Sequence, residues 1–400
     1  MKDILVGATV YDSKEINAVK KVLKEGWLGV GKYTDLFEKR VAKYVGHKYG
    51  IATNSGSSAL LLAVQSLNLP KGSKVIVCAA GFPATVAPIL HAGLIPVFVD
   101  AEMISYSIDS RWVERALFQY PDIKAIVFAH TVGNVANMDK IMLIAKNYRI
   151  PIIEDICDSL GSKWDGQMTG SFGDIACLSF YPSHHITAGG LGGMCLTSNE
   201  QYAKDIISLR DWGKLHETPE YYNAYTTDQR YFIKVDGIDY DYRYSYSHVG
   251  YNLKPSDLNS AFGLVQMDRL PEFIKIRNEN HAKLLREFID YPYFLPPGCY
   301  AEATPSWFNY PVVLADNAPF TRDELVKYFE SKQIRCRLFF AGNITRHPAF
   351  KGKGIIIGEL PVSDYLMKNA FLIACHPALT DANIKYIGDI LRTFLNSKTA

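Results

Sequence analysis

The sequence predicts an α/β protein, with a large domain built on a mainly parallel sheet flanked by helices and a smaller α+β domain at the C-terminal end. The first observation is a series of short, near-continuous apolar runs rich in β-branched residues. They lie at 74–79, 95–100, 124–130, 151–155, 174–180 and 192–197. The second is that helical patterns separate several of these runs, for example MDKIMLIAKNY at 138–148. Continuously apolar strands that alternate with helices are typical of a parallel sheet covered on both faces.

The pattern changes in the second half of the chain. A polar, tyrosine-rich stretch at 216–248 predicts a long loop, and loops of this length in a compact protein are often functional. A long helix is expected to begin at about Ser256, and the run YPVVL at 310–314 predicts a strand. We therefore expect a large domain over residues 1–250 and a smaller α+β domain over residues 251–400.

Composition excludes several classes of function. The 400 residues are 48% hydrophobic, enough for a sizeable core, and the net charge of +2 gives no reason to expect nucleic acid or an anionic membrane as partner. No apolar run approaches the roughly 20 residues that a membrane span needs. The first residues, MKDILVGATVYDSKE, lack the apolar centre of a signal peptide. We expect a cytoplasmic protein.

The seven cysteines are scattered and form no C-x-x-C pair. Several lie inside apolar strand-like runs, such as KVIVC and DIACLSF. Reduced, buried thiols are therefore expected, and a structural metal site is not.

A candidate anion site lies in NSGSSALLLAV at 54–64. Here Gly56, Ser57 and Ser58 open directly into an apolar helical pattern, so that free backbone amides at the start of a helix can meet a phosphate. Taken alone the signal is weak, because an ordinary serine N-cap gives the same letters.

Two further candidates follow predicted strands, where open α/β sheets bind ligands. Asp155 ends an apolar strand, and Asp158 comes just after it. Asp158 taken alone is better explained as a helix cap. Phe82 follows another strand and fits a core position as well as a stacking platform.

The fourth segment is SFYPSHHITAGGLGG at 179–193. Ser179 ends a strand, an aromatic-proline corner follows, and a glycine-rich loop comes after two histidines, His184 and His185. A lysine would be expected in such a loop, but the nearest lysines are Lys163 and Lys204.

In this order, the phosphate cradle, aromatic residue, strand-end carboxylate and serine loop resemble the fold-type I pyridoxal-phosphate enzymes. More specifically, the chain resembles the sugar aminotransferases of the DegT/DnrJ/EryC1/StrS family. The resemblance covers nearly the whole chain and includes the segments at 250–271, 306–312 and 337–348. In that family the lysine that binds the cofactor lies five residues after the serine, and the corresponding residue here is His184.

The exchange of lysine for histidine resembles the 3-dehydratase branch of the family. An imidazole cannot form an imine with the cofactor aldehyde, but it can act as a general base near neutral pH. The resemblance therefore implies non-covalently bound pyridoxal or pyridoxamine phosphate, with His184 as the catalytic base. With no lysine to protonate the sugar carbon, electrons leave by expelling the neighbouring hydroxyl group. His185 is expected to be a packing residue.

The resemblance also implies site residues by position. The cofactor-binding positions are Gly56, Ser57, Ser58, Phe82, Asp155, Asp158, Ser179 and Asn252. The serines would hold the phosphate, Phe82 would stack on the ring, Asp155 would pair with the ring nitrogen, and Asp158 would lie near the ring hydroxyl. Asn252 would reach the phosphate of a neighbouring subunit, which implies a homodimer. The implied substrate-binding positions are His216, Trp307, Arg337 and Asn343.

The sequence departs from the family's patterns in two places. One member of the branch carries a two-iron cluster on four cysteines and receives electrons from a reductase. Cys157 matches the first of these cysteines, but the stretch at 210–229 that should supply the others contains none. Four ligands are needed, so no iron–sulfur cluster is expected. The loop at 188–193 also lacks the family's usual glutamate before Gly-Gly and is one residue longer.

Three functions remain open at this point. The first is a 3-dehydratase that acts on a nucleotide-linked 4-keto-6-deoxy sugar in dideoxysugar biosynthesis, with L-glutamate as amino donor. The second is an atypical nucleotide-sugar aminotransferase, and the third is a catalytically degenerate cofactor-binding protein. The serines, Asp155 and a chemically useful His184 argue against the third. The nucleotide and the stereochemistry of the sugar stay open.

Overall fold

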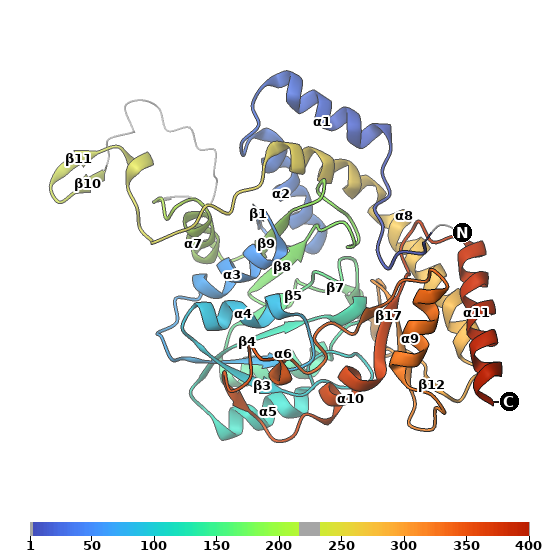
Figure 1. The fold of residues 1–400 in the computed structure, drawn as a ribbon. Helices are drawn as coiled ribbons and strands as arrows, with labels where there is room; N and C mark the ends of the chain where they lie inside the picture. Colours follow the sequence, from blue (N-terminus) through green and yellow to red (C-terminus); the bar gives the residue numbers. More distant parts are fainter. Residues whose placement is uncertain (1–2, 216–232, 400) are drawn as a thin grey trace.

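A mainly parallel sheet forms the centre of the protein (Figure 1). The computed structural model describes residues 3–215 and 233–399. In this part of the chain the sheet has eight strands in the order β1-β9-β8-β5-β4-β2-β3-β16, and β9 runs antiparallel to both its neighbours. The strands are β1 (Tyr49–Thr53), β2 (Lys74–Cys78), β3 (Ile95–Val99), β4 (Ile123–Ala129), β5 (Ile152–Asp155), β8 (Ile175–Ser179), β9 (Gly193–Thr197) and β16 (Ile355–Ile356). The predicted α/β class is confirmed.

The six predicted apolar runs are six of these strands, and each agrees with the observed strand to within one residue at either end. Their continuous apolar character has a simple cause, since successive side chains of a strand point to opposite faces and both faces are covered. In β2, Val75 and Val77 pack into one apolar cluster, whereas Ile76 between them packs into another. The strands β1 and β16 were not predicted.

Helices cover both faces of the sheet. The helices α3, α4 and α7 share an apolar cluster on one face, whereas α5, α6, α2 and α8 contribute to the clusters on the other. The helix expected from about Ser256 is α8, and Ser256 is its N-cap. The helices are α1 (Ser13–Glu25), α2 (Lys32–Val45), α3 (Gly56–Ser66), α4 (Pro83–His91), α5 (Ser110–Gln119), α6 (Met138–Tyr148), α7 (Glu200–Arg210), α8 (Asp257–Phe288), α9 (Arg322–Ser331), α10 (Pro361–Asn369) and α11 (Asp381–Thr399).

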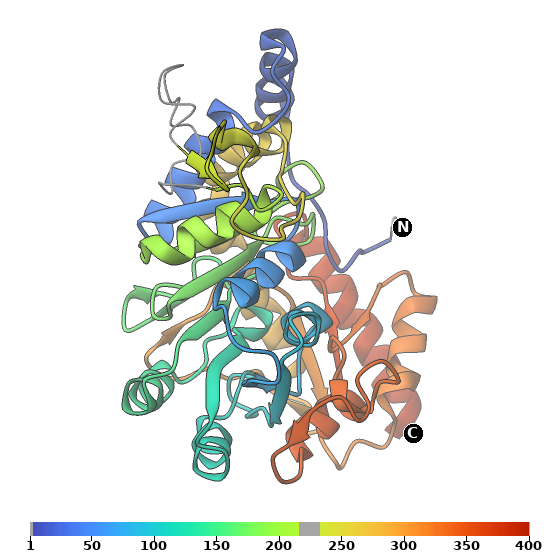
Figure 2. The ribbon, with the colours of Figure 1, turned by 90° about the vertical axis from the view of Figure 1, so that its left-hand side faces the viewer.

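A second, antiparallel sheet lies in the C-terminal part of the chain, to one side of the main sheet (Figure 2). Its strands, in spatial order, are β12 (Phe294–Leu295), β14 (Tyr310–Leu314), β17 (Ala370–Ile373) and β15 (Arg337–Leu338). The predicted strand at 310–314 is β14. Two features link this part to the main sheet: β16 pairs with β3, and one apolar cluster contains side chains of β4, β14 and β17. A domain division at residue 250 therefore stays a prediction.

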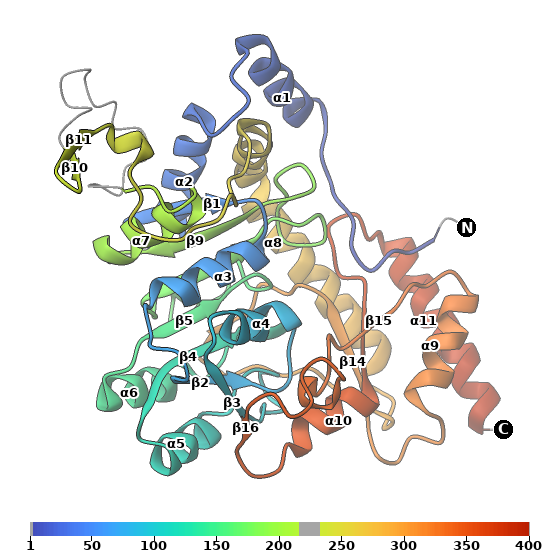
Figure 3. The same cartoon turned by 60° about the vertical axis from the view of Figure 1, so that its left-hand side comes forward.

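The long loop predicted at 216–248 contains a hairpin of β10 (Ile233–Val235) and β11 (Ile238–Tyr240). This hairpin lies on the side of the molecule away from the two termini (Figure 1 and Figure 3). Residues 216–232 of this predicted loop lie outside the described residues. The remaining short elements are β6 (Lys163–Trp164), β7 (Gln167–Met168), β13 (Ala303–Thr304) and the 3₁₀ turns Thr131–Gly133, Tyr242–Tyr244 and Ile344–Arg346. None of the helices in the described ranges is long and apolar enough to cross a membrane.

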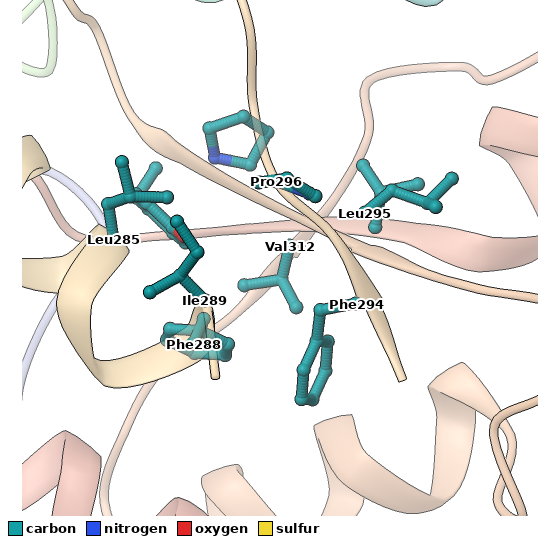
Figure 4. Close-up of a pocket in the computed structure, with 10 residues that line it drawn as sticks. Leu285, Phe288, Ile289, Phe294, Leu295, Pro296 and Val312 are labelled. Atoms are coloured by element: carbon teal, nitrogen blue, oxygen red, sulfur yellow. The ribbon is translucent and has the colours of Figure 1, made fainter. Parts of the chain in front are cut away.

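A small apolar pocket lies where the last turns of α8 meet β12 and β14 (Figure 4). Leu285, Phe288 and Ile289 form one wall, and Phe294 and Val312 face them. No carboxylate, imidazole or amine lines this pocket, and the phenol of Tyr310 in its lining has a pKa that burial raises.

Candidate active site

Loops at one edge of the main sheet bring the predicted site residues together. Asp155 and Ser179 are the last residues of the neighbouring parallel strands β5 and β8, so both lie at the carboxyl edge of the sheet. Phe82 follows β2 at the same edge as the N-cap of α4, and the residue is 57% exposed. An exposed aromatic ring at this position is available to stack on a ligand.

The amino terminus of α3 forms the predicted anion cradle. Ser55 is the N-cap, and its hydroxyl accepts a hydrogen bond from the Ser58 amide at 3.1 Å. The Ser58 hydroxyl in turn donates to Oδ1 of Asn54 at 2.6 Å, whereas Ser57 is exposed. The first amides of a helix have no partner within the helix, so this end presents donors to an anion.

Gly56 allows this helix to start directly against the end of β8. A Cβ atom at Gly56 would lie 2.6 Å from Cβ of Ser179 and 3.2 Å from the sulfur of Cys157. The serine of the predicted loop and the anion cradle are therefore in contact, and the contact depends on glycine.

The glycine-rich loop at 188–193 packs against the same helix end. A Cβ atom at Gly193 would lie 2.2 Å from the carbonyl oxygen of Ser55, and Gly192 has a φ of +143°, in the region that favours glycine. The loop therefore needs glycines where it meets the cradle.

Asp155 is a buried carboxylate with two donors. Thr85 donates from Oγ1 to Oδ2 at 2.7 Å, and the amide of Cys157 donates to Oδ1 at 3.1 Å. Burial raises the pKa of Asp155, and the structure gives this carboxylate no ion-pair partner among the described residues. A ligand that brings a protonated ring nitrogen would supply the missing positive charge.

His184 lies in the loop after β8, beside the loop after β5. Its imidazole stacks on Phe308 with ring centroids 5.0 Å apart, and its Nδ1 lies 3.5 Å from Oδ1 of Asp158. That Nδ1 atom is buried and has no hydrogen-bond partner among the described residues. Burial, reinforced by the charges of Arg277 and Arg337, lowers the pKa of His184 to about 3, so that the ring is a neutral base at neutral pH.

The pKa of Asp158 is shifted in the opposite direction. Burial raises the pKa of this carboxyl to about 8, and the nearby charge of Asp155 adds to the effect. The site thus contains a neutral imidazole next to a carboxyl group that keeps its proton near neutral pH.

His185, the neighbour of His184, is a packing residue, as expected. It is 2% exposed, and its Nε2 lies 2.8 Å from the carbonyl oxygen of Ser306.

The predicted substrate residues are placed differently from one another. Arg337 is exposed on β15, within electrostatic reach of His184. Trp307 is buried and stacks on His281, with centroids 3.9 Å apart. Asn343 is fully buried and donates to Asp364 at 2.7 Å. His216 lies outside the described residues.

Asn252 is exposed, and its backbone pairs with that of Asp211. The next residue, Leu253, accepts a hydrogen bond from the amide of Asn54, just before the anion cradle. The backbone of the predicted subunit-crossing segment is therefore fixed to the helix end that forms the cradle.

Sequence reasoning missed three residues that contact the site. Thr85 hydrogen-bonds Asp155, Phe308 stacks on His184, and Arg277 donates to the backbone carbonyl of His184 at 3.0 Å. A signal for Arg277 was present, because it continues the buried stripe of α8 formed by Leu270 and Phe273 at helical spacing.

No group of three or more histidine, cysteine or acidic side chains in the described ranges could hold a metal ion. The stretch at 210–229, in which the cluster cysteines were sought, contains no cysteine in its sequence, and its residues 216–229 lie outside those ranges.

Comparison with known proteins identifies the family of the chain. Residues 10–392 match the model of the DegT/DnrJ/EryC1/StrS aminotransferase family. The chain is 40% identical to the lipopolysaccharide biosynthesis protein RfbH of Salmonella typhimurium, over 94% of this chain and 88% of that protein. It is 37% identical to the dTDP-4-dehydro-2,6-dideoxy-D-glucose 3-dehydratase of Saccharopolyspora spinosa, over 97% of this chain and 86% of that enzyme.

Solved structures give the same result for the fold. A GDP-4-keto-6-deoxymannose-3-dehydratase variant with bound GDP-perosamine superposes with a TM-score of 0.88 at 27% identity, covering 97% of this chain and 100% of the other. A second structure, the Escherichia coli GDP-4-keto-6-deoxy-D-mannose-3-dehydratase with bound hydrated pyridoxal phosphate, also has a TM-score of 0.88 at 27% identity, covering 98% and 100%. The expected fold-type I architecture is therefore confirmed.

The family model matches almost the whole chain, and the identity to two curated relatives is 40% and 37%. This chain belongs to the DegT/DnrJ/EryC1/StrS aminotransferase family.

Proposed function

We propose that this protein is a pyridoxamine-phosphate-dependent dehydratase that removes the C3 hydroxyl group of a nucleotide-linked 4-keto-6-deoxy sugar, with L-glutamate as amino donor. The observation that carries the proposal is the Nδ1 atom of His184, which is buried and has no hydrogen-bond partner among the described residues. By resemblance, His184 corresponds to the family's cofactor-binding lysine. Similarity to named sugar 3-dehydratases supports the reaction class. A related structure that holds a pyridoxal phosphate–glutamate geminal diamine supports the donor.

The described residues fit the cofactor. The amino end of α3 and the Ser179 hydroxyl would hold the phosphate, with Ser57 and Ser58 in the first turn of the helix. Phe82 would lie against the ring. Asp155, buried and without an ion-pair partner in the described ranges, would hold the proton of the ring nitrogen.

Bound pyridoxamine phosphate supplies an amine that condenses with the sugar ketone and a ring that accepts electrons. His184 then acts as the base. A proton on Nδ1, facing Asp158, leaves Nε2 as the basic atom that takes up a proton from carbon. Asp155 keeps the ring nitrogen charged, which favours this proton transfer.

The absence of a lysine at position 184 directs the outcome. An imidazole does not compete for the cofactor aldehyde, and no side-chain amine returns a proton to the sugar carbon. Because His184 does not return a proton to the sugar carbon, the electrons instead expel the neighbouring hydroxyl group. The oxygen leaves C3 as water, and one water molecule is taken up when the released imine of the sugar is hydrolysed to the ketone and ammonia. In sum, the sugar and glutamate give the 3-deoxy ketosugar, 2-oxoglutarate and ammonia, so atoms and electrons balance.

We further propose that the enzyme acts in the cytoplasm as a homodimer, in which Asn252 completes the site of the partner subunit. No iron–sulfur cluster and no reductase are required, because glutamate supplies the two electrons of the deoxygenation. The lack of cysteine between Cys195 and Cys299 supports this part of the proposal.

The test is an incubation of the protein with pyridoxal phosphate, L-glutamate and a panel of GDP-, CDP- and dTDP-linked 4-keto-6-deoxy sugars. We expect one sugar to give a product lighter by one oxygen atom, with 2-oxoglutarate and ammonia in equal amounts. A product that carries an amino group at C4 would instead identify an aminotransferase.

A further inference from the structure

Arg277 of α8 places a charged group behind the loop that carries His184. Its guanidinium is 1% exposed and donates three hydrogen bonds to backbone carbonyls. Nη1 donates to Phe308 at 2.6 Å, and Nη2 donates to Ser183 at 3.3 Å and to His184 at 3.0 Å. One side chain therefore holds both the backbone of the histidine and the residue on which the histidine ring stacks.

This arrangement is expected to lower the stability of the folded state. No carboxylate forms an ion pair with Arg277 among the described residues, and its Nε has no hydrogen-bond partner there. A buried cation without an ion-pair partner destabilises the folded state, whereas an apolar side chain of similar volume would not. On the buried stripe of α8, Phe273 lies one turn before Arg277, and Asn280 and His281 lie one turn after it.

We propose that Arg277 is a positioning residue for His184, which clamps the 183–184 backbone and Phe308 so that the imidazole is held in one orientation. The proposal rests on the function proposed above for His184. Arg277 does not touch the reacting atoms and acts only through the histidine and its stacking partner.

The charge of Arg277 has a second effect on the same ring. The charged or titratable groups around His184 are Asp158, His185, Arg277 and Arg337. Burial makes the largest contribution to the lowered pKa of His184, and Arg277 comes next. The charge of Arg277 therefore favours the neutral form of the ring, and it also lowers the basicity of the ring.

Two variants separate the clamp from the charge, and a third serves as control. Arg277→Met removes both the charge and the hydrogen bonds. Arg277→Lys keeps the charge but cannot reproduce a fork that reaches three carbonyls. Asn280→Leu is the matched control, because Asn280 lies on the same helix, is buried, and donates to the carbonyls of His376 and Leu379 instead.

The first readout is steady-state dehydration by the holoenzyme. In Arg277→Met and Arg277→Lys we expect kcat to fall by about 10-fold to 100-fold, the size expected for a displaced catalytic group, with KM for the sugar changed by less than about twofold. Asn280→Leu should lower the thermal midpoint without this loss of kcat. An equal loss of kcat in all three variants would overturn the proposal, since it would reduce Arg277 to a stabilising residue.

The second readout needs neither cofactor nor substrate. The hydrogen–deuterium exchange of the histidine C2 proton, followed by mass spectrometry against pH, gives the titration midpoint of His184. In Arg277→Met the midpoint should move to higher pH than in the wild type, and exchange at high pH should be faster because the loop is no longer held. Arg277→Lys should share the faster exchange but keep a midpoint closer to that of the wild type.

The two readouts distinguish failure of this proposal from failure of the proposed function. If the wild type dehydrates no sugar, the proposed function fails, and the exchange of His184 alone decides the role of Arg277. Exchange curves of Arg277→Met that coincide with those of the wild type and of Asn280→Leu would refute a role of Arg277 in holding His184.

Discussion

The Nδ1 atom of His184 lies 3.5 Å from Oδ1 of Asp158, and this pair joins the loops that follow β8 and β5. The two strands are parallel neighbours, so their carboxyl ends place both groups at one edge of the sheet. The pKa of the histidine is lowered to about 3 and that of the aspartate is raised to about 8, in each case chiefly by burial. A neutral imidazole and a proton-holding carboxyl group thus lie side by side, at the position that the resemblance assigns to the lysine of the family's aminotransferases.

The raised pKa of Asp158 predicts how stability depends on pH in the unliganded protein. The folded state retains the Asp158 proton between the usual aspartate pKa, 3.8, and about 8, whereas the unfolded chain has lost it. The contribution is therefore fully present below the lower value and is lost as pH rises through the upper one. Asp158→Asn removes this dependence, so the thermal midpoint of the variant relative to wild type should be higher at about pH 8.5 than at about pH 5. An equal difference at both values would contradict the raised pKa.

Thr85 is expected to contribute to cofactor binding through Asp155. Thr85→Val removes the hydroxyl that donates to Oδ2 at 2.7 Å and leaves a buried carboxylate with one donor fewer. Loss of such a bond costs about 1–3 kcal/mol, so the Kd for pyridoxal phosphate should rise by about 10-fold, as measured by absorbance titration. Thr169→Val is the control, because Thr169 is equally buried but bonds the carbonyl of Ser159. An unchanged Kd in Thr85→Val would exclude this role.

Gly56→Ala should separate the anion cradle from the end of β8. The new methyl group would meet Cβ of Ser179 at 2.6 Å, so helix or strand must move. We expect weaker binding of pyridoxal phosphate, by about 10-fold or more, together with a loss of stability typical of overpacking, about 1–3 kcal/mol. Gly298→Ala is the control, since a methyl group there meets no atom within 4 Å. Wild-type affinity in Gly56→Ala would show that the contact does not shape the cradle.

His184→Lys restores an amine at the position of the family's cofactor lysine. We expect the variant to hold pyridoxal phosphate covalently after borohydride reduction, with the label on the peptide that contains position 184, whereas wild-type protein releases the cofactor on denaturation. Dehydration should fall sharply, because the amine captures the cofactor and can return a proton to the sugar carbon. A reduced adduct on a lysine of the wild-type protein would argue that the cofactor is not free.

Much of the fold could be predicted from the sequence, because a sheet that is buried on both faces needs strands that are continuously apolar. The strands β2, β3, β4, β5, β8 and β9 are continuous apolar runs, and the capping residue Ser256 marks the start of α8. The strand β16 could not be predicted, since it is two residues long and its pairing with β3 depends on the tertiary fold.

The sequence was sufficient to predict the candidate residues that lie at strand ends, namely Asp155 and Ser179. It was not sufficient where a side chain acts across the fold. Arg277 continues the buried stripe of α8, but its bonds to the carbonyls of Ser183 and Phe308 form only in the tertiary fold. Phe308, likewise, meets His184 only because the C-terminal sheet packs against the active-site loops.

The central claim is that His184 is the base of a sugar dehydration, and His184→Asn tests it most directly. The measurement is the rate at which the sugar loses its C3 oxygen, followed by mass spectrometry, in wild type and variant loaded with the same amount of cofactor. Removal of a general base typically lowers the rate by about 10²–10⁴-fold, so we predict a loss of at least about 100-fold, with cofactor binding retained through Asp155 and Ser179. A variant that keeps more than about a tenth of the wild-type rate would contradict the account, because the base would then be another group.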